Sequence, residues 1–144
     1  MLLANNLKLL PNDRKYWEYI RQLRTCRENL DGFVEQNYIT EADQINYMSK
    51  YNDNYYICFN ENKPVGFIGV VENDIRLATD PNYKGKGIGS FMVKEIVKVY
   101  PQAVAKVKLD NISSTRLFKS LNFIEFKIDK QFRYFKYTSN NEIS

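Results

Sequence analysis

The chain has 144 residues, of which 44% are hydrophobic and 15% aromatic, and its formal net charge is +4. This length and apolar content predict one globular domain over residues 1–144 and exclude a disordered chain. The sequence contains no histidine and two cysteines. The commonest general base, most zinc sites and a disulfide framework are therefore excluded, and we expect no metal.

The apolar runs, the first residues and the distribution of charge narrow the class of protein further. No apolar run approaches the ~18 residues that span a bilayer, and the first residues lack the features of a signal peptide, so we expect a cytoplasmic protein without a membrane partner. Residues 83–144 hold 12 of the 21 Lys and Arg residues and 5 of the 17 Asp and Glu residues. This basic half suits a polyanionic ligand.

The first fifty residues predict one strand and two helices. A short strand is expected from Leu7 to Leu10, and helical spacing of apolar residues predicts a helix over roughly Arg14 to Arg27. A second helix is expected from Ala42 to Tyr51, with Ile45 and Met48 facing the core.

Three strands follow, over Tyr55 to Phe59, Val65 to Val71 and Ile75 to Thr79. Two short turns rich in asparagine separate them, which predicts an antiparallel meander. The next helix is expected from Ser90 to Tyr100. Its predicted inward face is made of Ile88, Phe91, Met92, Ile96 and Val99.

The last third predicts a strand, a short helix and a closing hairpin. The strand covers Val104 to Leu109, and Ser113 or Ser114 begins the helix. Asn122 follows that helix in a position that suits the left-handed conformation. The hairpin strands are expected over Phe123 to Ile128 and Phe132 to Tyr137. The order predicts a mixed sheet with helices on both faces.

The stretch from Asp80 to Ser90 stands between the third meander strand and the following helix. It carries glycines at 85, 87 and 89 and lysines at 84 and 86. Glycine permits positive φ and leaves no Cβ in the way of a ligand, and a helix N-terminus adds unpaired N–H groups. The stretch is typical of a phosphate-binding loop. The alternative is a tight connection whose glycines only relieve crowding.

Two segments together resemble the GNAT superfamily of acyl-CoA-dependent N-acetyltransferases. The family's pyrophosphate loop reads Arg or Gln, two residues, Gly, one residue, Gly or Ala, and Lys84, Gly87 and Gly89 occupy these places. The second segment runs from Asn111 to Phe123, where Asn122-Phe123 replaces the usual Gly-Phe. The resemblance covers roughly residues 55–127.

This resemblance implies a fold and a cofactor. The fold is a mostly antiparallel sheet of about six or seven strands, splayed between strands four and five, with helices on both faces. The cosubstrate is acetyl-CoA, whose acetyl group passes by direct attack to a primary amine of a small molecule, an amino sugar or a protein. The implied coenzyme-binding residues are Leu77, Ala78, Thr79, Lys84, Gly85, Lys86, Gly87, Ile88, Gly89, Ser90, Asn111, Ser114 and Phe118.

The catalytic groups are less clear from the residues. A backbone N–H near Ala78 is the expected oxyanion donor. Asp74 is our candidate for the group that accepts the proton lost by the amine, with Glu72 as the alternative. Tyr134 is our candidate for the general acid that protonates the departing thiolate. Tyr38 and Tyr137 are further candidates for that role.

Some side chains depart from the family's pattern. Phe118 stands where the family often has a tyrosine that acts as the general acid. Lys106 stands where some relatives have a glutamate that acts as the general base. Arg76 either contacts an acidic group of the substrate or forms a structural ion pair with Glu72 or Asp74.

Three other functions stay open. The first is a catalytically silent acyl-CoA-binding module of the same fold. A Rossmann site is disfavoured because a meander precedes the glycine loop. A nucleic-acid partner is disfavoured because the lysines concentrate at that loop instead of on a face interleaved with aromatic residues. A homodimer is left open.

Overall fold

The computed structural model describes residues 6–26, 29 and 39–138. Within these residues, seven strands form one sheet in the order β1-β2-β3-β4-β5-β7-β6. The strands are β1 Leu7–Pro11, β2 Tyr55–Asn60, β3 Lys63–Val71, β4 Asp74–Thr79, β5 Val104–Lys108, β6 Phe123–Ile128 and β7 Phe132–Tyr137. The helices are α1 Trp17–Thr25, α3 Glu41–Tyr51, α4 Ile88–Val99 and α5 Ile112–Ser120. Short 3-10 turns cover Arg14–Tyr16, Asn52–Asn54 and Pro81–Tyr83.

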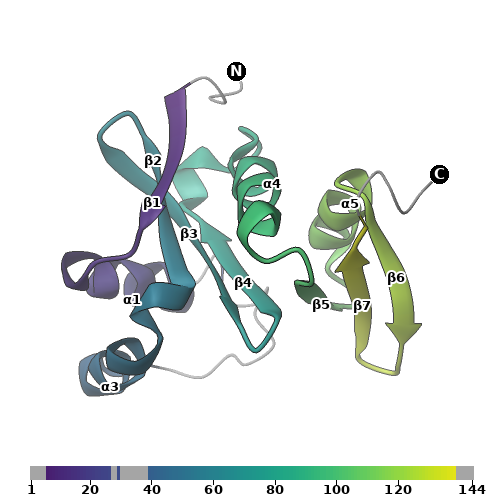
Figure 1. Ribbon diagram of the computed structural model, residues 1–144, viewed down its shortest axis with the longest axis horizontal. Helices are drawn as coiled ribbons and strands as arrows, with labels where there is room; N and C mark the ends of the chain where they lie inside the picture. The colour runs from purple at the N-terminus through teal and green to yellow at the C-terminus, as the bar shows by residue number, and fades with distance from the viewer. Residues whose placement is uncertain (1–5, 27–28, 30–38, 139–144) are drawn as a thin grey trace.

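The sheet is antiparallel except where β4 meets β5. These two strands run parallel and share one residue pair, Asp74 with Val104. Beyond this pair they separate, so that β1 to β4 and β5-β7-β6 form two half-sheets (Figure 1). The predicted mixed sheet, splayed between the fourth and fifth strands, is confirmed.

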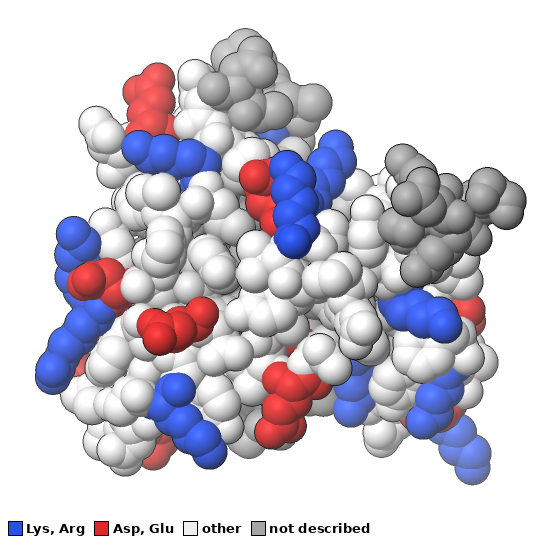
Figure 2. All heavy atoms as spheres, viewed as in Figure 1, with Lys and Arg blue, Asp and Glu red and all other residues white. Residues whose placement is uncertain are grey.

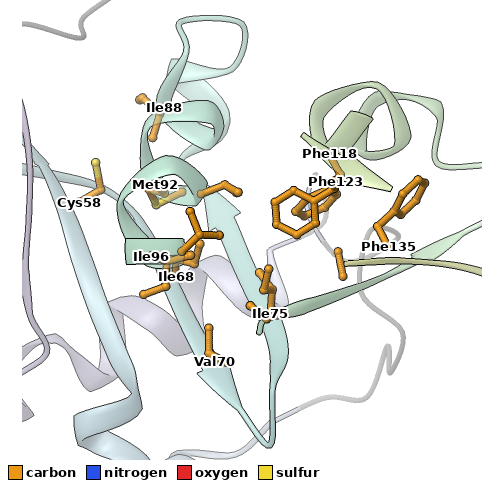
Figure 3. Packing of buried hydrophobic residues seen from close by; sticks show 14 of the residues in the cluster. Cys58, Ile68, Val70, Ile75, Ile88, Met92, Ile96, Phe118, Phe123 and Phe135 are labelled. Atoms are coloured by element: carbon orange, nitrogen blue, oxygen red, sulfur yellow. The ribbon is translucent and has the colours of Figure 1, made fainter. Parts of the chain in front are cut away.

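Helices cover both faces of the sheet, as predicted. Buried residues of α1 and α3 pack on one face against Tyr55, Ile57 and Phe67. On the other face, Ile88, Met92 and Ile96 of α4 lie over residues of β2, β3 and β4, and Phe118 of α5 lies beside Phe123 and Phe135 (Figure 3). The core on this second face is continuous across the split between β4 and β5.

Local sequence signals explain where several elements begin and end. Thr40 caps α3 through a capping box with Asp43, in which each side chain accepts the other's backbone N–H. Asp13 caps the 3-10 turn that precedes α1, so the helix itself begins at Trp17, later than predicted. Asn122 adopts φ 69°, as predicted from its place after α5.

Two inward faces were predicted incompletely. Ile45 of α3 is 46% exposed, because Gln44 and Met48 form the buried stripe and the next residue points about 100° away from it. In α4, Val99 of the last turn is exposed, and Val93 and Val97 are buried in its place. Within the described ranges, no helix is long and apolar enough to cross a membrane.

Candidate active site

A cavity of about 1460 Å³ lies where β4 and β5 separate. The glycine loop and the start of α5 line one part of it, and residues of α1 and α3 line the other. Since these helices cover opposite faces, the cavity passes through the split in the sheet. The predicted coenzyme-binding residues that line it are Leu77, Ala78, Thr79, Lys84, Gly85, Gly87, Ile88, Gly89, Ser90, Asn111, Ser114 and Phe118. Lys86 is predicted but does not line it.

The loop between β4 and α4 is shaped by Asp80 and two glycines. The Asp80 side chain accepts the N–H of Asn82 at 3.0 Å and turns the chain away from the strand. Gly85 and Gly87 then adopt φ of 79° and 84°, a region that side chains other than glycine's rarely occupy. The loop therefore depends on glycine for its backbone path.

Helix α4 begins at this loop without a side-chain cap, because its N-cap residue is Gly87. The first N–H groups of a helix have no intrahelical acceptor and carry the positive end of its dipole. A Cβ placed on Gly85 would meet nothing within 4 Å, and one on Gly89 would reach only ordinary contact with Leu117 and Leu77. At Gly85 and Gly89 the missing side chain therefore relieves no crowding and leaves space open beside the loop.

Helix α5 contributes its N-cap and a buried aromatic ring. The Asn111 Oδ1 accepts the N–H of Ser114 at 3.1 Å, so this asparagine both caps α5 and lines the cavity. Phe118 is 3% exposed, with ring centroids 5.0 Å from Phe123 and 6.3 Å from Phe135. Phe118 therefore supplies an apolar wall at the position where the resemblance leads one to expect a tyrosine acting as the general acid.

The open edge of β4 presents alternate backbone groups to the cavity. The N–H of Asp80 donates to Val65 of β3, whereas the carbonyl of Asn73 accepts the N–H of Val104 at 2.7 Å, on the β5 side. Backbone groups of a strand alternate in direction with a period of two. Leu77 and Thr79 therefore face the split.

This alternation corrects one predicted role. Ala78 pairs with Phe67 in the antiparallel register, and its carbonyl would lie 2.9 Å from a Cβ placed on Gly66 of β3. Its backbone thus points toward β3 and not into the opening. The expected oxyanion donor near Ala78 is better placed on Leu77 or Thr79.

A hydrogen-bonded network forms the other part of the cavity. The Arg76 Nε lies 3.5 Å from Oδ2 of Asp74, and its Nη1 donates to the Tyr47 hydroxyl at 3.0 Å. That hydroxyl lies 2.8 Å from the hydroxyl of Tyr55. All four residues line the cavity. The ion-pair interpretation of Arg76 is confirmed, with Asp74 and not Glu72 as its partner.

Burial changes the acidity of this network. It raises the pKa of Asp74, and the charges of Arg76 and Lys106 oppose the rise. Burial also raises the pKa of the Tyr55 hydroxyl, so this group stays protonated. A carboxyl with a raised pKa is a stronger proton acceptor than an ordinary aspartate.

The remaining acid and base candidates lie elsewhere. Glu72 is exposed in the β3–β4 turn, with φ 53°, and does not line the cavity. Tyr134 does not line it either, because β7 is separated from β4 by β5. Its hydroxyl donates to Asp129 at 2.9 Å, which raises its pKa and weakens it as an acid. Tyr137 packs against Phe123 outside the cavity. Tyr38 lies outside the described residues.

Several cavity residues were missed from the sequence. Tyr47 lies next to the buried Met48 on α3. Because α3 packs over β2 and β3, the Tyr47 hydroxyl comes within hydrogen-bond distance of Arg76 on β4. Asn29 donates its side-chain amide to the carbonyl of Thr79 at 3.1 Å and so joins the end of β4 to the region after α1. One sequence signal could have pointed to Tyr55. A glycine inside a strand, here Gly69, often marks the close approach of another group, and the Tyr55 ring lies against it.

The fold agrees with the comparisons. The sequence matches the profile of the Acetyltransferase (GNAT) family over residues 17–123. The chain therefore belongs to the GNAT family of acetyltransferases. A search of curated proteins returns no match.

Solved structures of acetyltransferases share the fold. Spermidine N-acetyltransferase from Vibrio cholerae, in complex with CoA and spermine, is 15% identical with a TM-score of 0.75, covering 92% of this chain and 93% of that one. An N-acetyltransferase from Staphylococcus aureus is 14% identical with a TM-score of 0.75, covering 91% and 97%. The ribosomal-protein alpha-N-acetyltransferase RimL, in complex with CoA, is 16% identical with a TM-score of 0.72, covering 93% and 94%.

Among the described residues, no group of three or more Cys, Asp or Glu side chains is arranged to hold a metal ion.

Proposed function

We propose that this protein is an acetyl-CoA-dependent N-acetyltransferase that acts on a primary amine by direct attack in a ternary complex. The observation that carries the proposal is the cavity through the split sheet, which joins a glycine loop at a helix N-terminus to a half-exposed Asp74–Arg76 ion pair. One part suits a pyrophosphate and the other an amine. Two proteins of similar fold were solved in complex with CoA, one of them also with spermine, which supports a coenzyme and an amine as the two ligands.

The glycine loop and α5 fit the coenzyme. The amides from Lys84 to Ser90 surround the start of α4, where an anion is stabilised by unpaired N–H groups and the helix dipole. Asn111 and Ser114 line the cavity beside β5, where they can hydrogen-bond an extended arm. Acetyl-CoA would supply the activated acyl thioester there.

The edge of β4 fits the reacting carbonyl. The N–H groups of Leu77 and Thr79 point into the split, so one of them can donate to the oxygen that gains charge when the amine nitrogen bonds to the acyl carbon. Fixed donors aimed at a developing charge lower the barrier without reorganisation. As the carbon–sulfur bond breaks, the thiolate takes a proton from water or from the ammonium.

Asp74 fits the role of proton acceptor. It lines the amine side of the cavity, and burial raises its pKa toward the range useful to a general base. We expect Asp74→Asn to remove the acidic limb of the kcat/KM profile against pH, while Glu72→Gln, a matched change at an exposed position, leaves it in place. An unchanged profile in Asp74→Asn would exclude the role.

The first experiment is calorimetric titration with acetyl-CoA. Gly87→Glu places bulk and negative charge at the start of α4, and Gln102→Glu adds the same charge in the exposed turn after α4. We expect saturable binding to the wild type and to Gln102→Glu, and loss of binding in a folded Gly87→Glu variant. Equal binding by both variants would contradict the assigned coenzyme site.

A catalytically silent acyl-CoA-binding module is the second candidate. It is favoured by Phe118, which supplies no proton at the usual acid position, and by Lys106 at a usual base position. Release of free thiol from acetyl-CoA in a panel of polyamines, amino sugars and peptides separates the two. Release that depends on the amine supports the enzyme, whereas binding without release supports the silent module.

A further inference from the structure

One face of the half-sheet β5-β7-β6 carries lysines and aromatic rings in alternation. Helix α5 packs on the opposite face, where Phe123 and Phe135 meet Phe118. On the free face, the antiparallel register places Lys106 of β5, Tyr134 of β7 and Lys127 of β6 side by side. We call the set Lys106, Lys108, Lys127, Lys136, Phe126, Phe132 and Tyr134 the lysine–aromatic face.

The register explains the alternation. Residues two apart along a strand share a face, so β7 contributes Phe132, Tyr134 and Lys136 to it. Their partners on β5 include Lys108 and Lys106. The bulge in β6 turns Phe126 toward the same face, with its ring centroid 6.4 Å from that of Tyr134.

Contacts within the face hold ammonium groups over the rings. The Lys106 Nζ lies 4.3 Å from the ring centroid of Phe132, and the Lys127 Nζ lies 4.8 Å from that of Tyr134. Lys136 lies 5.7 Å from the Phe126 ring in the same way. Each of these three rings thus carries an ammonium group over its face, and Phe126 is the exposed ring of the three, whereas Phe132 and Tyr134 are half-buried.

The charge of this face is predominantly positive. Two acidic groups lie beside it: Asp129, whose carboxylate accepts the Tyr134 hydroxyl, and Asp74, whose charge interacts with that of Lys106. Glu125, the other acid of β6, pairs with Arg133 at 2.9 Å and belongs to the opposite face. Figure 2 shows basic side chains around the part of the surface that β6 and β7 occupy in Figure 1.

We propose that the lysine–aromatic face binds single-stranded nucleic acid. The rings can stack on bases when the lysines that lie over them turn to the phosphates, and Phe126, at 48% exposure, is the ring most open to a base. An acidic peptide would use the lysines but would leave the Phe126 ring without a flat partner. The sequence-based reason against nucleic acid was the lack of an aromatic-interleaved basic face, and β5-β7-β6 forms such a face.

The face continues into the cavity. Lys106 and Lys108 belong to the lysine–aromatic face and also line the cavity. A strand bound across β6, β7 and β5 therefore leads toward the amine side of the split. Binding of nucleic acid at this face does not depend on the proposed acetyltransferase function.

The test is fluorescence anisotropy with a labelled, mixed-sequence single-stranded oligonucleotide of about 12 nucleotides, a length within the span of known single-strand sites. The variant is Lys127→Glu/Lys136→Glu. The matched control is Lys94→Glu/Lys119→Glu, which changes the net charge equally at exposed positions of α4 and α5. We expect about tenfold or greater weakening in the first variant and less than about twofold in the control, with binding that falls with salt. Equal weakening in both, or no binding by the wild type, would overturn the proposal.

The contribution of the rings is measured separately. Phe126→Ala removes a half-exposed ring, and Ile112→Ala removes a similarly exposed apolar side chain of α5. We expect about fivefold weaker binding in Phe126→Ala, because base stacking is lost, and no change in Ile112→Ala. An unchanged affinity in Phe126→Ala, or equally tight binding of a labelled poly-glutamate peptide, would reject nucleic acid as the ligand.

The coenzyme site provides an independent control. A folded Gly87→Glu variant should keep its affinity for the oligonucleotide while it loses acetyl-CoA. Loss of oligonucleotide binding in Gly87→Glu would place the nucleic acid in the glycine loop and overturn the assignment to the lysine–aromatic face. Failure of acetyl-CoA to bind the wild type would instead contradict the proposed function alone.

Discussion

At the scale of single residues, the part of the cavity that we propose for the amine depends on groups that contact one another across three elements. Arg76 of β4 contacts both Asp74 and the Tyr47 hydroxyl of α3, and Tyr47 in turn contacts Tyr55 of β2. Each of these groups is partly or fully removed from solvent. Changes at one position therefore affect the acidity and the position of the others.

The raised pKa of Asp74 predicts how stability depends on pH. A carboxyl whose pKa is higher in the folded than in the unfolded chain binds more protons when folded, so the free energy of unfolding falls as pH rises through the interval between the two values. That interval begins near the ordinary value of 3.8 and extends upward. We expect Asp74→Asn to gain stability relative to the wild type as pH rises through it. Thermal unfolding of both proteins across this range tests the prediction, and a constant difference would contradict it.

Gly69 provides a second prediction at this scale. A Cβ at this position would lie 2.4 Å from Cδ1 of the Tyr55 ring, closer than any real contact. We expect Gly69→Ala to lower the free energy of unfolding by about 1–3 kcal/mol, because the buried ring must move. Urea unfolding measures the change.

The matched control for Gly69 removes the ring instead. In a Tyr55→Ala background the added methyl group meets empty space, so Gly69→Ala should cost much less there. Equal costs in both backgrounds would show that contact with Tyr55 is not the cause.

At the scale of elements, the part of the cavity that we propose for the coenzyme depends on the N-termini of two helices. Helix α4 begins at Gly87 without a side-chain cap, whereas α5 begins at Asn111, whose side chain accepts a backbone N–H of its own helix. The first helix thus leaves N–H groups available to a ligand, and the second uses its cap to fix the orientation of a cavity residue.

The cap of α5 can be tested by substitution. Asn111→Ala removes the acceptor for the Ser114 N–H and should lower the free energy of unfolding by about 1 kcal/mol. Asn111→Asp keeps an acceptor and should restore most of that stability. We also expect weaker binding of acetyl-CoA in Asn111→Ala. Equal stability of the alanine and aspartate variants in urea unfolding would contradict the capping role.

At the scale of the whole molecule, local patterns predicted the elements better than the site. Alternation and helical spacing identified the seven strands and the helices, and the two motifs placed the split between β4 and β5. The network of Tyr47, Tyr55 and Arg76 was not predictable, because it joins positions far apart in sequence through packing. Tyr134 was chosen for its chemistry, and only the strand order shows that β5 separates it from β4.

The single residue pair between β4 and β5 has a consequence for hydrogen exchange. The amides of Leu77 and Thr79 face the split, whereas those of Arg76 and Ala78 lie on the β3 side. We expect the first two amides to exchange with deuterated solvent faster than the second two, and to slow when acetyl-CoA is added. Equal exchange in the ligand-free protein would contradict the alternation along β4. Beyond that pair, the edge of β4 that faces β5 lacks a neighbouring strand. A ligand that lies along β4 would occupy the place of that strand and accept its backbone hydrogen bonds.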